Sequence, residues 1–124
     1  MSSDYNLLKQ IEESVISRGY PIVNRGLIVF GGKNNGTVDL KASNQDSTKS
    51  IIIEIKSSPV HLIDLSQFLS LKRNIETHNT NKREELAFYL ITSEVNISPT
   101  IRQLAKSKGI IVENIIEFLK RNKL

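Results

Sequence analysis

The sequence predicts one α/β domain, residues 1–124, in which helices flank a mixed central β-sheet. Apolar residues recur at helical spacing in several segments, whereas short aliphatic runs bounded by turn signals indicate strands between them. The first three strands are close enough in sequence to form hairpins, and the later strands are separated by helices, which requires parallel crossovers. A chain of 124 residues is the size of one ordinary domain. The expected order is helix, three strands, helix, strand, helix, strand, helix.

The first half of the chain is expected to contain one helix and three strands. Leu7, Leu8, Ile11 and Val15 lie at helical spacing, and Gly19 follows as a stop signal, so residues 4–18 are predicted to be a helix. Extended pieces are predicted at 21–23 and 27–30 on either side of Asn24-Arg25-Gly26, followed by strands at 37–42 and 51–56 with a polar loop between them.

The second half is expected to alternate helices with strands. Apolar residues from Leu62 to Ile75 predict a long helix after Pro59, and residues 86–92 form an apolar run short enough for a buried strand. Ser98 and Pro99 are a cap and a first-turn proline for a helix that Gly109 ends. Residues 110–112 and 115–119 are the last predicted strand and helix.

The composition excludes several kinds of functional site and indicates a cellular compartment. Cysteine is absent, which excludes disulfides and cysteine-based zinc or nucleophile sites and suits the cytoplasm. The N-terminus lacks the apolar core of a signal peptide, and no aliphatic run approaches membrane-spanning length, so no membrane partner is expected. Gly31-Gly32 lacks the lysine and spacing of a phosphate-binding loop, and no small-molecule cofactor is expected.

A net charge of +4 and a pI of about 9.4 permit a polyanionic partner. The basic residues occur in short clusters rather than in a long tail, which favours a folded basic surface. The charge therefore favours a nucleic acid as partner, although many solvated surfaces have a similar excess of lysine.

The strand at 51–56 carries two opposite charges that need an explanation. Residues two apart share a face, so Glu54 and Lys56 point to the same side as Ile52, and the other isoleucines point to the opposite side. Charges on a half-buried face are costly unless they are paired or bound. Glu54 and Lys56 could pair with each other or lie at an exposed end of the sheet. Alternatively, Asp39 on the preceding strand could face them.

Two carboxylates that converge from neighbouring strands form a hard-oxygen site suited to Mg²⁺. Asp39 and Glu54 would supply these carboxylates, and Lys56 beside them could orient a water molecule. The pattern thus predicts a Mg²⁺ site, at which Mn²⁺ is expected to substitute.

Asp39 followed by Glu54-Ile55-Lys56 resembles the signature of the PD-(D/E)xK, or restriction-endonuclease-like, nuclease superfamily, with Val38 in place of the leading proline. The segments 89–93, 98–109 and 110–112 are similar to the strand, helix and strand that close the core in Mrr-like restriction nucleases. The small size and the glycine-containing loop at 31–36 are instead similar to archaeal Holliday-junction resolvases. Both subfamilies stay open.

The resemblance implies a restriction-endonuclease-like core and metal-dependent hydrolysis of DNA phosphodiester bonds. Asp39, Glu54 and the Ile55 carbonyl would hold one metal ion, with Glu12 contacting it directly or through water, and Lys56 would act on the attacking water. A second metal ion stays open. An acid from the first helix is also implied. Glu12 lies at the edge of the apolar stripe of that helix and is preferred to Glu13, which points away from it.

Four further residues are candidates for contacts with DNA. The resemblance implies Gln67, whereas the basic side chains could reach phosphates; the candidates are Lys33, Gln67, Lys72 and Arg73. One site per chain implies a homodimer if both strands or a junction are cut, with residues 27–30 or the final helix as interface. The alternatives are an inactive DNA-binding or assembly protein with the nuclease fold, and a protein-interaction module without a nucleic-acid role.

Overall fold

A computed structural model describes residues 3–29, 36–56, 59–79, 81 and 83–121. The elements follow the predicted order of types. They are α1 (Ser3–Ser17), β1 (Ile22–Val29), β2 (Gly36–Ser43), β3 (Lys49–Lys56), α2 (Leu62–His78), β4 (Glu85–Thr92), α3 (Pro99–Ser107), β5 (Ile110–Asn114) and α4 (Ile115–Lys120).

The five strands form one sheet in the order β1-β2-β3-β4-β5. β1 pairs with β2 and β2 with β3 in antiparallel fashion, as expected for hairpins. β3, β4 and β5 are parallel neighbours, because α2 and α3 provide the crossovers between them. The prediction of a mixed sheet is confirmed.

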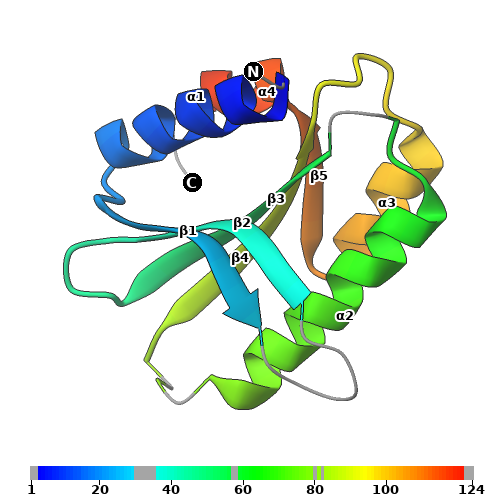
Figure 1. The fold of residues 1–124 in the computed structure, drawn as a ribbon. Helices are drawn as coiled ribbons and strands as arrows, with labels where there is room; N and C mark the ends of the chain where they lie inside the picture. Colours follow the sequence, from blue (N-terminus) through cyan, green and yellow to red (C-terminus); the bar gives the residue numbers. More distant parts are fainter. Residues whose placement is uncertain (1–2, 30–35, 57–58, 80, 82, 122–124) are drawn as a thin grey trace.

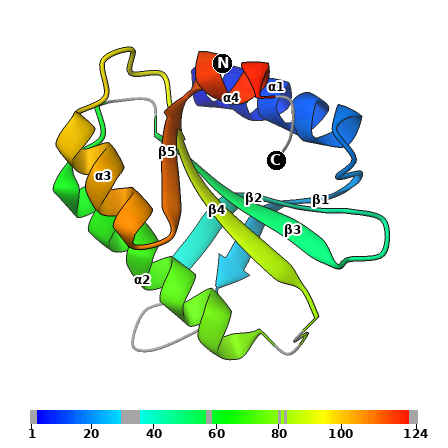
Figure 2. The same cartoon turned by 180° about the vertical axis from the view of Figure 1, so that it is seen from behind.

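The helices cover the sheet on both faces (Figures 1 and 2), and each face has its own apolar core. Under α1 and α4, Ile11 and Phe118 pack on Leu40, Ile51 and Ile53. Under α2 and α3, a second set packs together that includes Ile52, Leu65, Phe68, Phe88 and Ile101. The alternation of β3 divides its isoleucines between the two cores, so this strand is buried on both faces.

β1 differs from the two short extended pieces that its sequence predicts. It continues through Asn24-Arg25-Gly26, and its paired residues share one register from Ile22↔Ser43 to Val29↔Gly36. Gly26 has φ +62°, a left-handed conformation that a residue without Cβ adopts at little cost. The glycine was interpreted as a break, but it accommodates a local distortion inside a continuous strand.

Within the described ranges, no helix is long and apolar enough to cross a membrane.

Candidate active site

The candidate site begins where β2 and β3 stop pairing. Their ladder runs from Ser43↔Ser50 to Leu40↔Ile53. At the next position the side chains of Asp39 and Glu54 take over the contact between the strands. The Asp39 amide donates to Glu54 Oε1 at 3.2 Å, and the Ile55 amide donates to Asp39 Oδ2 at 2.7 Å. Each carboxylate thus accepts a hydrogen bond from the backbone of the opposite strand.

This crossed arrangement also orients the Ile55 carbonyl. In a strand the N–H and the C=O of one residue point to the same neighbouring strand. The Ile55 N–H points to Asp39 on β2, so its carbonyl faces the same gap beyond the last paired residues, Leu40 and Ile53. Two carboxylates and one carbonyl therefore belong to the opening between the strands.

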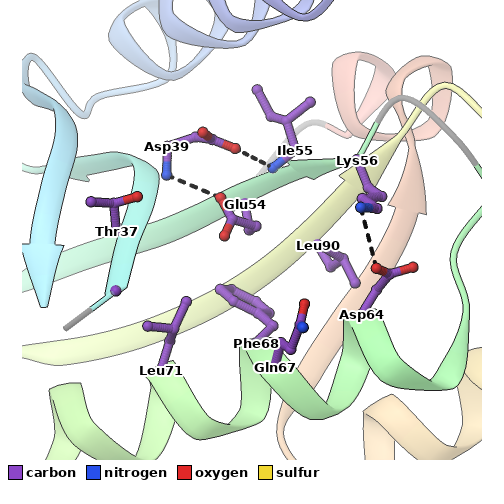
Figure 3. A pocket seen from close by; sticks show the side chains of 11 residues that line it. Thr37, Asp39, Glu54, Ile55, Lys56, Asp64, Gln67, Phe68, Leu71 and Leu90 are labelled. Carbon is purple, nitrogen blue, oxygen red and sulfur yellow. Dashed lines mark hydrogen bonds and ion pairs between the residues drawn. The ribbon is translucent and has the colours of Figure 1, made fainter. Parts of the chain in front are cut away.

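A pocket of about 390 Å³ lies at this opening, and Figure 3 shows the side chains that line it. β2 and β3 form one wall, α2 forms the other, and Leu90 of β4 lies between them. The lining residues are Gly36, Thr37, Asp39, Glu54, Ile55, Lys56, Asp64, Gln67, Phe68, Leu71 and Leu90. The pocket lining therefore includes Asp39, Glu54 and Lys56 together.

The acidic pair has an unusual proton affinity. Burial first, and then the hydrogen bond to Asp39 and the repulsion from its carboxylate, raise the pKa of Glu54 from 4.5 to about 9. The attraction of Lys56 opposes this shift but does not cancel it. At neutral pH without a cation, Glu54 is consequently protonated beside Asp39.

Lys56 forms its ion pair with a residue that the sequence analysis did not single out. Its Nζ lies 3.3 Å from Oδ1 of Asp64, which is in the first turn of α2. The proposed mutual pairing of Glu54 and Lys56 is not what the structure shows. The available sequence signal was an acid at the third position of a predicted helix, which is common in helix starts and does not by itself indicate a pocket.

Glu12 is not brought to the pocket. It forms an ion pair with Arg25 of β1, and Glu13 is exposed. Arg25 is paired with Leu40, whose side chain lies in the core under α1, whereas Glu54 shares the opposite face with Ile52. Glu12 faces the sheet, as its place at the edge of the apolar stripe of α1 suggested. It lies over β1, however, and not at the pocket.

Of the four residues predicted to contact DNA, one lines the pocket, two lie outside its lining, and one is not described. Gln67 lines the pocket. Lys72 is correctly assigned to α2 but points elsewhere: it pairs with Glu76 at 3.0 Å and lies over the Phe88 ring. Arg73 is exposed outside the pocket lining, and Lys33 lies outside the described residues.

The donor set of the pocket fits one hard cation. Mg²⁺ prefers oxygen ligands and is often held by one or two carboxylates together with water and substrate phosphate. Asp39, Glu54 and the Ile55 carbonyl provide such oxygens, and burial and the neighbouring Asp39 raise the pKa of Glu54, a penalty on the charged form that a bound cation would offset. Within the described residues, no group of three or more acidic, histidine or cysteine side chains is arranged so that it could hold a metal ion. The metal would thus need ligands beyond the side chains.

Comparison with known proteins shows similarity in structure. The chain matches no protein-family model and no curated protein sequence. It is similar to AF1548, a protein of unknown function, with a TM-score of 0.68 and 17% identity over 91% of this chain and 64% of that one. It is also similar to a repair endonuclease from Pyrococcus abyssi, with a TM-score of 0.62 and 19% identity over 92% of this chain and 47% of that one.

A third solved structure, protein VC1899 from Vibrio cholerae, has a TM-score of 0.64 and 13% identity over 90% of this chain and 30% of that one. This chain therefore spans less than two thirds of the length of each of the three. The similarity covers nearly all of the chain at low identity. The chain accordingly has a mixed α/β fold shared with a repair endonuclease.

Proposed function

We propose that the domain is a Mg²⁺-dependent deoxyribonuclease of the PD-(D/E)xK type, which hydrolyses phosphodiester bonds in DNA. One observation carries the proposal: Asp39 and Glu54 meet where β2 and β3 separate, with Lys56 in the same pocket. In a purely structural ion cluster these charges would pair with each other. Here the carboxyl of Glu54 contacts Asp39 and keeps its proton at neutral pH, and Lys56 pairs with Asp64.

The metal would be held by Asp39, Glu54 and the Ile55 carbonyl, and it would stabilise the negative charge that develops on the phosphate. Glu54 must release its proton before it can bind a cation, because a protonated carboxyl is a poor ligand. The Lys56 ammonium can donate hydrogen bonds to an attacking water or to a phosphate oxygen. Gln67, on the opposite wall of the pocket, can donate a hydrogen bond from its side-chain NH₂ group to a phosphate oxygen of the DNA backbone.

Two observations support DNA as the substrate class. The net charge of +4 favours a polyanion, with affinity supplied by counterion release. The fold is also shared with a repair endonuclease. If the substrate is a duplex or a junction, the single pocket implies a homodimer.

The test is cleavage of labelled single-stranded, duplex, flap and four-way-junction DNA with Mg²⁺ or Mn²⁺. The wild type should cut at least one substrate only when metal is present. Glu54→Gln and Lys56→Met should each lower the rate by about 10²- to 10⁴-fold. Glu76→Gln is the matched control, because it removes the carboxylate of another lysine pair, outside the pocket lining. Equal cutting by Glu54→Gln would refute the proposal.

A second candidate is a DNA-binding protein that has the fold without the activity. It is favoured by the position of Glu12, which pairs with Arg25 and leaves Asp39 and Glu54 without a carboxylate from α1. Such a protein would bind DNA equally well in Mg²⁺ and in EDTA, and it would cut with neither.

A further inference from the structure

The Lys56 ammonium is held by a carboxylate from a different element. Its Nζ lies 3.3 Å from Asp64 Oδ1, and the side chains are 40% and 10% exposed, respectively. A lysine has four rotatable side-chain bonds, and an exposed lysine normally samples many rotamers. Figure 3 shows the lysine extending from β3 toward α2, where Asp64 meets it at the edge of the pocket.

Asp64 is itself held in place by its own hydrogen bond and by the packing of the start of α2. Its Oδ2 accepts a hydrogen bond of 2.8 Å from the His61 amide, and an acid in the first turn is favoured by the helix dipole. The adjacent Leu65 and Phe68 are buried, which fixes the rotation of α2 about its axis. The Val60 amide donates to Glu94 at 2.9 Å, which ties the start of the helix to the segment after β4.

The two oxygens of Asp64 thus have separate partners: Oδ2 caps the helix and Oδ1 faces the lysine. We also considered Asp64 as a third ligand for the cation. Among the described residues, however, Asp64 does not form a metal-binding group with Asp39 and Glu54. Glu54 is on the same strand face as Lys56, yet its carboxyl contacts Asp39 rather than the lysine.

We infer that Asp64 is a positioning residue, which holds the Lys56 ammonium at the pocket opposite Asp39 and Glu54. This inference rests on the proposed function. A displacement of about 1 Å in a catalytic group can lower the rate on the order of 10²-fold. An ammonium that is held in one position therefore supports a faster reaction than a mobile one. α2 then takes part in the site through Asp64, although β2 and β3 supply the carboxylates and the lysine.

The first test is a double-mutant comparison of single-turnover cleavage rates. Asp64→Asn retains an oxygen that can cap His61 but lacks the charge that holds the lysine, and it should slow cleavage about 10- to 100-fold. In a Lys56→Met background the same change should have no further effect, because Asp64 acts through Lys56. Asp64→Glu restores the carboxylate and should recover part of the rate. The control, Glu76→Gln, should cut like the wild type.

A loss of the same factor in both backgrounds would overturn the inference, since a residue that only caps the helix acts independently of Lys56. The second test does not depend on cleavage: ¹⁵N relaxation of the Lys56 Nζ group measures its order. Asp64→Asn should lower that order, and Glu76→Gln should leave it unchanged. An ordered ammonium in Asp64→Asn would overturn the inference. If the wild-type protein cuts no DNA, but the Lys56 ammonium loses order in Asp64→Asn, the proposed function alone is refuted.

Discussion

Replacing Glu54 with glutamine should stabilise the metal-free protein at neutral pH, although it removes a proposed metal ligand. The pKa of Glu54 is raised from 4.5 to about 9 in the fold, chiefly by burial and by the hydrogen bond and charge of Asp39. Below the unfolded pKa both states are protonated, and the full stability is present. As the pH rises from 4.5 toward 9, the unfolded chain ionises while the folded chain keeps its proton, and stability is lost.

The loss amounts to about 1.4 kcal/mol per pH unit, and it therefore reaches at most about 3 kcal/mol at pH 7. Glutamine has nearly the same shape and does not titrate. Its oxygen can accept from the Asp39 amide, and its NH₂ can donate to the Asp39 carboxylate. Solvent that reaches the half-buried side chain reduces the gain, so we expect about 1 to 3 kcal/mol at neutral pH.

The assay is urea unfolding of the wild type and Glu54→Gln in EDTA, from about pH 4 to about pH 8.5. The difference in the free energy of unfolding should be near zero at the acid end and should grow with pH in favour of glutamine. Glu76→Gln, which changes a half-exposed carboxylate outside the pocket lining, should stay within about 0.5 kcal/mol of the wild type throughout. A difference that does not change with pH, or a Glu54→Gln protein less stable at pH 7, would refute the reasoning.

Three further predictions follow from the site and the fold. Mg²⁺ or Mn²⁺ at 100 times its dissociation constant should stabilise the wild type by about 2.7 kcal/mol, measured by thermal unfolding, with little effect on Glu54→Gln; an equal shift in both proteins would count against the metal site. Gly26→Ala should lower the free energy of unfolding by about 1 to 2 kcal/mol, because its φ of +62° is strained for a residue with Cβ; unchanged urea unfolding would contradict this. Phe68→Ala should cost about 3 to 5 kcal/mol in the same assay, since the ring is 1% exposed; a loss below about 1 kcal/mol would show that the core under α2 is loosely packed.

The order of the elements and the chemistry of β3 were predictable because they depend on local patterns. Alternation along a strand determines that Glu54 and Lys56 share the face of Ile52, and the structure confirms it. A hairpin brings Asp39 beside Glu54 with few alternative registers, because a shift of one residue would move Glu54 to the face that Ile51 and Ile53 bury under α1. The meeting of Asp39 and Glu54 on neighbouring strands could therefore be anticipated.

The residues that were misplaced or missed depend on contacts distant in sequence. Glu12 faces the sheet as its helical position suggested, but Arg25 of β1 pairs with it there, and no local pattern reveals that partner. Lys72 lies on α2, over the Phe88 ring, and its contact with DNA stays a prediction. Asp64 looked like an ordinary helix-capping acid, and only the packing of α2 on the sheet brings it to Lys56.

The central claim is that Asp39 and Glu54 hold one divalent cation where β2 and β3 separate. The most direct measurement is Mn²⁺ binding followed by electron paramagnetic resonance, in the absence of DNA. The account predicts one saturable Mn²⁺ per chain for the wild type and for Glu76→Gln, with affinity lowered at least about tenfold in Asp39→Asn and in Glu54→Gln. Saturable binding that both of these variants retain, or no saturable binding by the wild type, would contradict it.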